Sequence, residues 1–200
     1  MTGLDPAGPL LEQARELDRE AGVETDYRVG AAEATGLPDA SYGVVTAGQC
    51  RHWFDAPKAG AELRRLLRPG GRVVIAHFDW LPLPGNVVEA TEELILAFNP
   101  AWTPGGGTGL HPRWLTDLAT SGFTGIETFT FDLDVPYLPY PPEAWRGRIR
   151  ADAGVGATLP PDEVERFDEA LGRVLRDRFP GEVVQVPHRT WAVVATKGES

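Results

Sequence analysis

The stretch YGVVTA at residues 42–47, followed after a helical segment by RVVIAH at residues 72–77, decides the fold class. Each is a short, continuous apolar run, which is typical of a strand buried on both faces of a sheet. Between them, Asp55 and Pro57 mark a helix start, and the apolar residues of 59–67 recur at helical spacing. A strand, a helix and a second strand in this order predict a parallel sheet with helices on its faces.

The residues before this stretch continue the same alternation. Apolar residues recur at helical spacing over 10–21, where Gly22 is a natural stop, and 25–29 is typical of a short strand. Residues 2–5 have the character of the end of a buried strand that runs into a turn. In open sheets of this type, ligands bind at the carboxyl ends of the strands, so we expect the site there.

The second half predicts a more varied set of elements. We expect helices over 87–98, 112–121 and 162–178, strands over 123–133 and 183–196 with a break near Pro187, a mobile loop over 99–109 and an extended connector over 136–142. The expected fold is α/β, a doubly wound, mostly parallel sheet with an α-rich lid insertion. We expect a single domain over 1–200, with its core at 1–80, 111–134 and 183–197 and its lid at 81–110 and 135–182.

Composition excludes several classes of function. The 200 residues carry a formal net charge of −10, which argues against binding to nucleic acid or to an anionic membrane surface. The single cysteine, Cys50, rules out an intramolecular disulfide and a multi-cysteine zinc site, and we expect no metal. We interpret Cys50 as a small buried residue rather than a nucleophile. No apolar run approaches the roughly 20 residues of a membrane span, and no signal peptide is evident, so we expect a cytoplasmic protein.

Several short motifs occur in an order that resembles the class I S-adenosylmethionine-dependent methyltransferases, in their small-molecule branch. The match is best over residues 2 to 80 and survives beyond them only as a pattern. The motifs are GLDP at 3–6, GAAEA at 30–34, GLP at 36–38, SYGVVTAGQCRHWFD at 41–55, LLRPGGRVV at 66–74, GF at 122–123 and WAVVA at 191–195. The resemblance implies a Rossmann-like sheet of strand order 3-2-1-4-5-7-6 and S-adenosylmethionine as cofactor.

The resemblance also implies roles for the first two motifs. Asp5, followed by Pro6, stands where the family's acidic residue accepts hydrogen bonds from the ribose hydroxyls, although a carboxylate there can instead cap the next helix. Ala31, Ala32 and Glu33 stand beside the adenine, where many relatives carry Asp-Ala-Glu. The usual carboxylate is absent, so backbone groups and packing would hold the base, and Glu33 either substitutes in part or faces solvent.

The motif after the 42–47 strand implies the methionine and methyl end of the site. Ala47, Gly48 and Gln49 would lie beside the methionine part of the cofactor, with His52 and Trp53 near the methyl donor. His52 is the candidate general base, or else a structural histidine of the loop, and His77 and His111 are the alternative bases. Trp53 can equally pack in the core. Gly43 departs from the family, where relatives usually carry Asp.

The family's glycine-rich turn after strand one is missing, although it is expected roughly 20 residues before Asp5. Only four residues precede Asp5. We therefore expect an N-terminally shortened form of a methyltransferase, in which strands two and four lack their shared partner. A degenerate homologue that has lost cofactor binding is the competing explanation. A partner chain that supplies the strand is a further possibility, and the oligomeric state is open.

The expected function is methyl transfer to a small-molecule acceptor, and the aromatic-rich second half is the expected acceptor lid. Candidate acceptor residues are Trp80, Trp102, Trp145 and Arg148, in a region that also holds Trp114, Tyr137 and Tyr140. The run WRGRIR at 145–150 either attracts an acceptor carboxylate or forms a solvated helix face. A non-catalytic binding or scaffold role remains the alternative. A nucleotide-dependent reductase is disfavoured because the chain lacks Gly-x-Gly-x-x-Gly and Tyr-x-x-x-Lys patterns.

Overall fold

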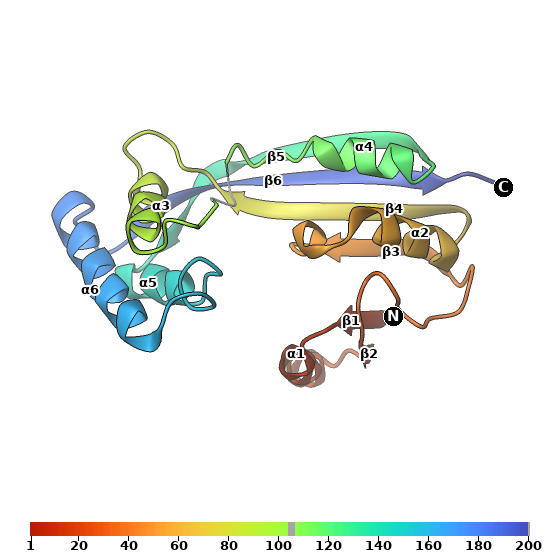
Figure 1. Cartoon of the computed structure of the whole chain (residues 1–200), viewed down its shortest axis with the longest axis horizontal. Coiled ribbons are helices and arrows are strands. Elements are labelled where there is room, and N and C mark those ends of the chain that lie inside the picture. Colours follow the sequence, from red (N-terminus) through yellow and green to blue (C-terminus); the bar gives the residue numbers. More distant parts are fainter. Residues whose placement is uncertain (104–106, 200) are drawn as a thin grey trace. The chain divides into compact units, whose positions relative to one another are not determined.

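The computed structural model describes residues 1–103 and 107–199, with the side chains of 132–137 left out (Figure 1). Residue contacts divide the chain into two compact units. Unit 1 comprises Met1–Ala76, His111–Thr128 and Ala192–Ser200, and unit 2 comprises His77–Leu110 and Phe129–Trp191. The expected loop segment 104–106 and the side chain of Tyr137 lie outside the described part of the chain.

Unit 1 begins with a small parallel sheet. Strand β1 (Thr2–Asp5) pairs with β2 (Asp26–Val29) in the register Thr2↔Asp26 to Asp5↔Val29, as the sequence predicts for its first two strands. Helix α1 (Gly8–Ala21) connects the two strands and ends at Gly22, which has a left-handed φ of 67°. A residue without Cβ adopts this conformation without strain, so the sequence signal for the helix end is confirmed.

The second parallel pair of strands forms from the two apolar runs at 42–47 and 72–77, as the sequence predicts. Strand β3 (Tyr42–Gly48) pairs with β4 (Leu67–Trp80) from Val44↔Arg72 to Gly48↔Ala76. The helical connection is the 3-10 turn η1 (Arg51–Trp53) and α2 (Ala56–Leu66), where an Asp55 carboxylate oxygen accepts a 3.2 Å hydrogen bond from the Lys58 backbone N–H. Short apolar strands joined by a capped helix therefore build this βαβ unit.

The four-stranded sheet is mixed, which corrects the expectation of a mostly parallel sheet. Its order is β3-β4-β6-β5, with β5 at Phe123–Tyr140 and β6 at Val184–Lys197. The β6 arrow runs against those of β4 and β5 in Figure 1. The two helices between β5 and β6 return the chain from the end at which β5 stops, and such a return gives an antiparallel neighbour. The expected break near Pro187 is also wrong, since β6 continues through it.

Strand β3 is more exposed than its apolar sequence predicts. It is an edge of the four-stranded sheet, and β1 and β2 form a separate sheet. Val44 is 54% exposed, although a strand of this composition predicts burial on both faces. Within the described residues, one hydrogen bond links a side chain of β3 to a side chain of β1, from the Tyr42 hydroxyl to Thr2 Oγ1 at 3.1 Å.

Unit 2 is built around a helical core. Helix α6 (Pro161–Arg178) packs against α3 (Val87–Phe98) and α5 (Pro142–Arg150), and the amphipathic pattern predicted for α6 is confirmed. The fully buried side chains include Trp145, Phe167 and Leu171. The remaining helix, α4 (Arg113–Thr120), belongs to unit 1. Of the helices in the described residues, none combines the length and apolarity needed to cross a membrane.

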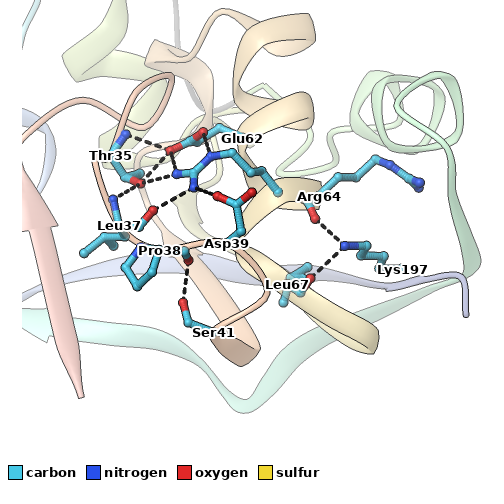
Figure 2. A network of polar contacts seen from close by, with 10 residues as sticks. Thr35, Leu37, Pro38, Asp39, Ser41, Glu62, Arg64, Leu67 and Lys197 are labelled. Carbon is cyan, nitrogen blue, oxygen red and sulfur yellow. Dashed lines mark hydrogen bonds and ion pairs between the residues drawn. The ribbon is translucent and has the colours of Figure 1, made fainter. Parts of the chain in front are cut away.

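A polar network fixes the loop between β2 and β3 to helix α2 (Figure 2). One Glu62 oxygen accepts hydrogen bonds from the Thr35 backbone N–H at 2.8 Å and its hydroxyl at 2.6 Å. Arg65 donates to both Glu62 oxygens, to the Leu37 carbonyl and to Asp39. These hydrogen bonds, above all those from Arg65, lower the pKa of Glu62 to about 2. The charged form of Glu62 therefore stabilises the fold.

We predict that Glu62→Gln lowers the free energy of unfolding at pH 7 by roughly 1–3 kcal/mol, because Arg65 and Thr35 lose a charged acceptor. The folded-state pKa of Glu62 lies below its ordinary value of 4.5, so this stabilisation is complete above pH 4.5 and is lost as the pH falls towards 2. Urea unfolding of both proteins between pH 7 and pH 3 measures the difference. Glu20→Gln, at an exposed position of α1, is the matched control. A difference that is independent of pH would contradict the assignment.

Candidate functional site

The candidate cofactor residues of unit 1 follow the carboxyl ends of three parallel strands. Asp5 ends β1, residues 31–33 come shortly after β2, and Gln49 directly follows β3. The Gly30 backbone N–H donates to the Asp5 carbonyl at 3.2 Å, which joins the loop after β2 to the end of β1. A Glu33 carboxylate oxygen accepts a 2.8 Å hydrogen bond from the Asp55 backbone N–H, which ties the loop after β2 to the start of α2. The three loops therefore gather at one end of unit 1.

Asp5 lies at the entry to α1 and retains a free oxygen. Its Oδ1 accepts a 2.7 Å hydrogen bond from the Ala7 backbone N–H. Ala7 is the N-cap of α1 and no side chain among the described residues caps this helix, so the alternative role of Asp5 as a helix cap is wrong. Within the described chain, Oδ2 has no hydrogen-bond partner, and the side chain is half-buried. One oxygen therefore orients the carboxylate and the other is available to a hydroxyl donor.

The loop after β2 is a tight turn held by its own backbone. The Gly30 backbone N–H donates to the Asp5 carbonyl at 3.2 Å, and Ala31 forms an antiparallel bridge with Ala34. Ala31 and Ala32 offer only backbone polar groups and methyl surface. Glu33 supplies the one carboxylate of this triplet, and one of its oxygens is engaged at Asp55. Recognition of a planar base here would rest on backbone groups and packing.

The end of β3 has an unusual backbone conformation. Gln49 has a φ of 57°, which is rare for a residue with a side chain, and its N–H donates to the Ala76 carbonyl of β4 at 2.9 Å. Ala47 is buried, while no atom lies within 4 Å of the position that a Cβ on Gly48 would take. Strained backbone of this kind is concentrated at functional sites. The turn thus opens space directly above the carboxyl end of β3.

The 3-10 turn after β3 presents His52 and Trp53 outward. Arg51 is buried and forms a 2.9 Å ion pair with Asp117 on α4, which anchors the turn. Trp53 is 70% exposed and lies 4.7 Å from the His52 ring, measured between centroids. The interpretation of Trp53 as a core residue is therefore wrong. A short turn pinned by its first residue leaves the next two side chains facing away from the core.

The two alternative histidines belong to different units. His77, in unit 2, is buried, and its Nδ1 lies 3.5 Å from an Asp79 oxygen. His111, in unit 1, stacks on Trp114 with ring centroids 4.2 Å apart and planes 7° apart. Of the three candidate histidines, only His52 follows β3 directly. It is also exposed, and so it is open to an acceptor.

Three of the four candidate acceptor residues come together in unit 2. The Arg148 guanidinium lies 5.1 Å from the Trp80 ring centroid and 5.9 Å from that of Trp145. Trp102 packs elsewhere: a Cβ on Gly154 would come within 2.7 Å of its ring, and it contacts the helical core. Trp102 therefore has the position of a packing residue.

Sequence reasoning missed one member of this cluster, His188 on β6. Its Nε2 lies 3.3 Å from Arg148 Nη1, and its ring stacks on Phe78 with centroids 4.4 Å apart. Forty residues separate His188 from Arg148, and no local pattern marks it. Only its position in a strand neighbouring β4 and β5 in the sheet indicates the contact.

The fold and the placement of these loops define an α/β methyltransferase-like protein. The structure superposes on the YcgJ protein of Bacillus subtilis with a TM-score of 0.60 and 21% identity, covering 100% of this chain and 82% of that one. It also resembles phosphoethanolamine N-methyltransferase 2 of Haemonchus contortus, with a TM-score of 0.52 and 18% identity over 98% of this chain and 43% of that one. At these identities the likeness concerns the fold.

Sequence comparison identifies the family. Residues 1–75 match the methyltransferase domain family, and a 79-residue segment is 38% identical to the demethylmenaquinone methyltransferase of Thermus thermophilus. That segment is 39% of this chain and 36% of the relative. Over residues 1–75, the chain therefore matches the class I S-adenosylmethionine-dependent methyltransferases of the small-molecule type. It spans about a third or less of the length of these curated relatives.

We predict that Cys50 reacts slowly with iodoacetamide, because burial raises the pKa of its thiol, and Asp5 adds to this rise more than the nearby Arg51 opposes it. It is the chain's one cysteine, so mass spectrometry reads the reaction directly. The pH midpoint of alkylation should lie higher in the folded chain than in the urea-denatured chain, and Asp5→Asn should lower the folded midpoint. A folded midpoint at or below the denatured one would contradict this environment.

Proposed function

We propose that this protein transfers a methyl group from S-adenosylmethionine to a small-molecule acceptor. The observation that carries the proposal is the convergence of the loops after β1, β2 and β3 at one end of unit 1. The family implies the cofactor, and the Haemonchus enzyme of the same fold was solved with S-adenosylhomocysteine. Relatives named as a demethylmenaquinone methyltransferase and as a ubiquinone/menaquinone biosynthesis C-methyltransferase support a small-molecule acceptor.

The residues present fit the group that the family implies. Asp5 has one oxygen oriented by Ala7 and one available for a ribose hydroxyl. Gly48 has open space where a side chain would stand, as close approach of a ligand to backbone requires. The exposed ring of Trp53, in the turn that follows β3, offers an apolar surface to a ligand. We assign the ribose to Asp5 and Pro6, the base to Ala31, Ala32 and Glu33, and the methionine part to Ala47, Gly48 and Gln49.

When bound, S-adenosylmethionine would supply an electrophilic methyl group that passes in line from its sulfur to the acceptor nucleophile, and S-adenosylhomocysteine would leave with the electron pair of the broken S–C bond. The protein's contribution is mainly proximity and orientation, because the methyl group needs no further activation. Where the acceptor is a hydroxyl, a base must take its proton. We assign that role to His52, which is exposed beside Trp53 at the turn after β3. His77 and His111 are the alternatives.

The helical unit is the proposed acceptor lid. Unit 2 contains the expected lid residues Trp80, Trp145 and Arg148, with aromatic and charged side chains around a helical core. Trp102 belongs to that core and is the weakest of the assigned acceptor residues. Under this assignment the two units form one methyltransferase-like domain that works as a whole.

A non-catalytic binding role is the second candidate. Two observations favour it: β1–β2 and β3-β4-β6-β5 are separate sheets, and Ala31 and Gly43 stand where relatives carry acidic residues. A folded chain without affinity for S-adenosylhomocysteine would favour this candidate.

We predict that the chain binds S-adenosylhomocysteine with micromolar affinity and that Asp5→Asn weakens binding by about tenfold or more, because a charged acceptor for the ribose hydroxyls is lost. Asparagine keeps an oxygen for the Ala7 N–H, so the start of α1 is preserved. Isothermal titration calorimetry measures both proteins. Asp26→Asn, on the exposed neighbouring strand β2, is the charge-matched control and should bind as the native chain does. Equal affinity of the two variants would contradict the role of Asp5.

We predict that His52→Ala reduces turnover at least a hundredfold with a hydroxyl acceptor while it leaves S-adenosylhomocysteine affinity within about threefold, since general base catalysis contributes on the order of 10²–10⁴. Single-turnover methyl transfer and calorimetry provide the two readouts. His111→Ala tests the alternative base, and its turnover should stay within about threefold of the native value. An equal loss of rate and affinity would assign His52 to cofactor binding instead.

A further inference from the structure

Arg148 lies among three aromatic rings of unit 2. Its guanidinium carbon is 5.1 Å from the ring centroid of Trp80 on β4, 5.6 Å from Tyr140 on β5 and 5.9 Å from Trp145 on α5. The Trp145 side chain is fully buried and Arg148 is half-buried. Cation–π contacts at these distances hold the guanidinium in place and keep water from its faces.

Two hydrogen bonds use one nitrogen of this guanidinium. Arg148 Nη1 donates to the Tyr140 hydroxyl oxygen and lies 3.3 Å from His188 Nε2. His188 Nδ1 is 2.9 Å from the Val186 carbonyl oxygen, so Nδ1 carries the proton and Nε2 accepts from Arg148. Burial lowers the pKa of His188, and Arg148 lowers it further, while the hydrogen bond with the Val186 carbonyl and the charge of Asp79 oppose this shift. The net shift favours the neutral imidazole, which accepts from Arg148 and does not compete for an anion.

Arg148 differs from the other arginines of its helix. Arg146 and Arg150, one half-turn away on either side, both form ion pairs with Glu143 and Asp168. Within the described residues, no carboxylate comes within ion-pair distance of Arg148. A half-buried cation without an anionic partner is costly, and this cost is recovered when a ligand supplies the anion.

The remaining donors of Arg148 are arranged for a planar anion. A guanidinium has five N–H donors, and Nη1 uses its two at Tyr140 and His188. The Nε–H and the Nη2 hydrogens have no acceptor among the described residues. These two nitrogens share an edge that presents parallel N–H groups, the arrangement that binds a carboxylate or phosphate through two hydrogen bonds.

Two carboxyl groups of unit 2, those of the buried Glu92 and the half-buried Asp152, do not pair with the Nε–Nη2 edge of Arg148. Glu92 accepts a 3.0 Å hydrogen bond from Trp80 Nε1, and Asp152 accepts one of 2.8 Å from the Gly154 backbone N–H. Burial raises the pKa of both groups, although the charge of Arg148 lowers that of Asp152. Both carboxyls therefore have partners of their own and leave the open edge of Arg148 to a ligand.

We propose that the Nε–Nη2 edge of Arg148 binds an oxyanion of the methyl acceptor, a carboxylate in the first instance, with Trp80 and Tyr140 against the atoms that carry it. The proposal rests on the proposed function, because it names the acceptor's chemical class: a small acid rather than a neutral molecule. Of the arginines at 145–150, it assigns ligand binding to Arg148 and leaves Arg146 and Arg150 in the ion-paired face of α5.

The test follows the indole N–H resonances of Trp80 and Trp145 in the ¹⁵N-labelled full chain, without cofactor and at constant ionic strength. Benzoate is the carboxylate probe, benzamide its neutral counterpart, and inorganic phosphate the second anion. We expect saturable shifts with benzoate and none with benzamide. Arg148→Gln should weaken benzoate binding about tenfold or more, and Arg148→Lys, which keeps the charge but not the paired donors, should weaken it nearly as much.

Arg166→Gln, at an exposed position of α6, removes the same charge and should leave binding unchanged. Should Arg148→Gln fail to fold, the affinity of Arg148→Lys for benzoate tests the proposal instead, because lysine retains a cation beside the rings. Saturable binding of phosphate but not benzoate would assign the edge to a phosphorylated acceptor. Native affinity for both anions in folded Arg148→Lys, or no saturable shift with either anion, would overturn the proposal.

Failure of the anion-binding proposal can be distinguished from failure of the proposed function, because separate experiments test them. Calorimetry with S-adenosylhomocysteine reports on unit 1, and the anion titration reports on Arg148. Anion binding without cofactor binding would reject methyl transfer and leave an anion-binding protein. Cofactor binding with no anion binding would retain methyl transfer and reject an acidic acceptor.

Discussion

The parallel pairing of β3 with β4 is the constraint on which the rest of the structure depends. It fixes the carboxyl end of β3 beside Ala76, and the hydrogen bond from the Gln49 N–H to the Ala76 carbonyl ends the pairing. The chain then leaves the sheet through a left-handed residue, and η1 and α2 return it to β4. Because the turn is anchored by the buried ion pair of Arg51 with Asp117, His52 and Trp53 face outward. The chemistry proposed for unit 1 follows from that one strand end.

Local sequence patterns predicted most of unit 1 because its elements are short and closely connected. The end of α1 at Gly22, the pairing of β1 with β2 and the start of α2 at Asp55 all follow from neighbouring residues. The direction of β6 could not be predicted in this way, because it depends on how α5 and α6 return the chain. The exposure of Val44 depends on which strands flank β3, and its own apolar character gives no sign of it.

The residues of the candidate site also divide into those that local sequence predicts and those that only the fold brings together. Asp5 and Gln49 are located by motifs in the chain, whereas the surroundings of Arg148 come from four separate elements. The sequence singled out Trp80, Trp145 and Arg148 by residue type, but not the neutral His188 that takes one of the arginine's donors. Nor could it distinguish Arg148 from Arg146 and Arg150, since their carboxylate partners Glu143 and Asp168 come from two helices. Ion pairing across helices decides which arginine remains available.

The loops after β1, β2 and β3 are proposed to form a single nucleoside site. Amide hydrogen exchange with and without S-adenosylhomocysteine tests this assignment, because it reports on each loop separately. We expect exchange to slow together in three segments, 5–8, 30–34 and 47–54, with one dependence on ligand concentration. Unchanged exchange in a folded sample, or slowing in one segment alone, would contradict it.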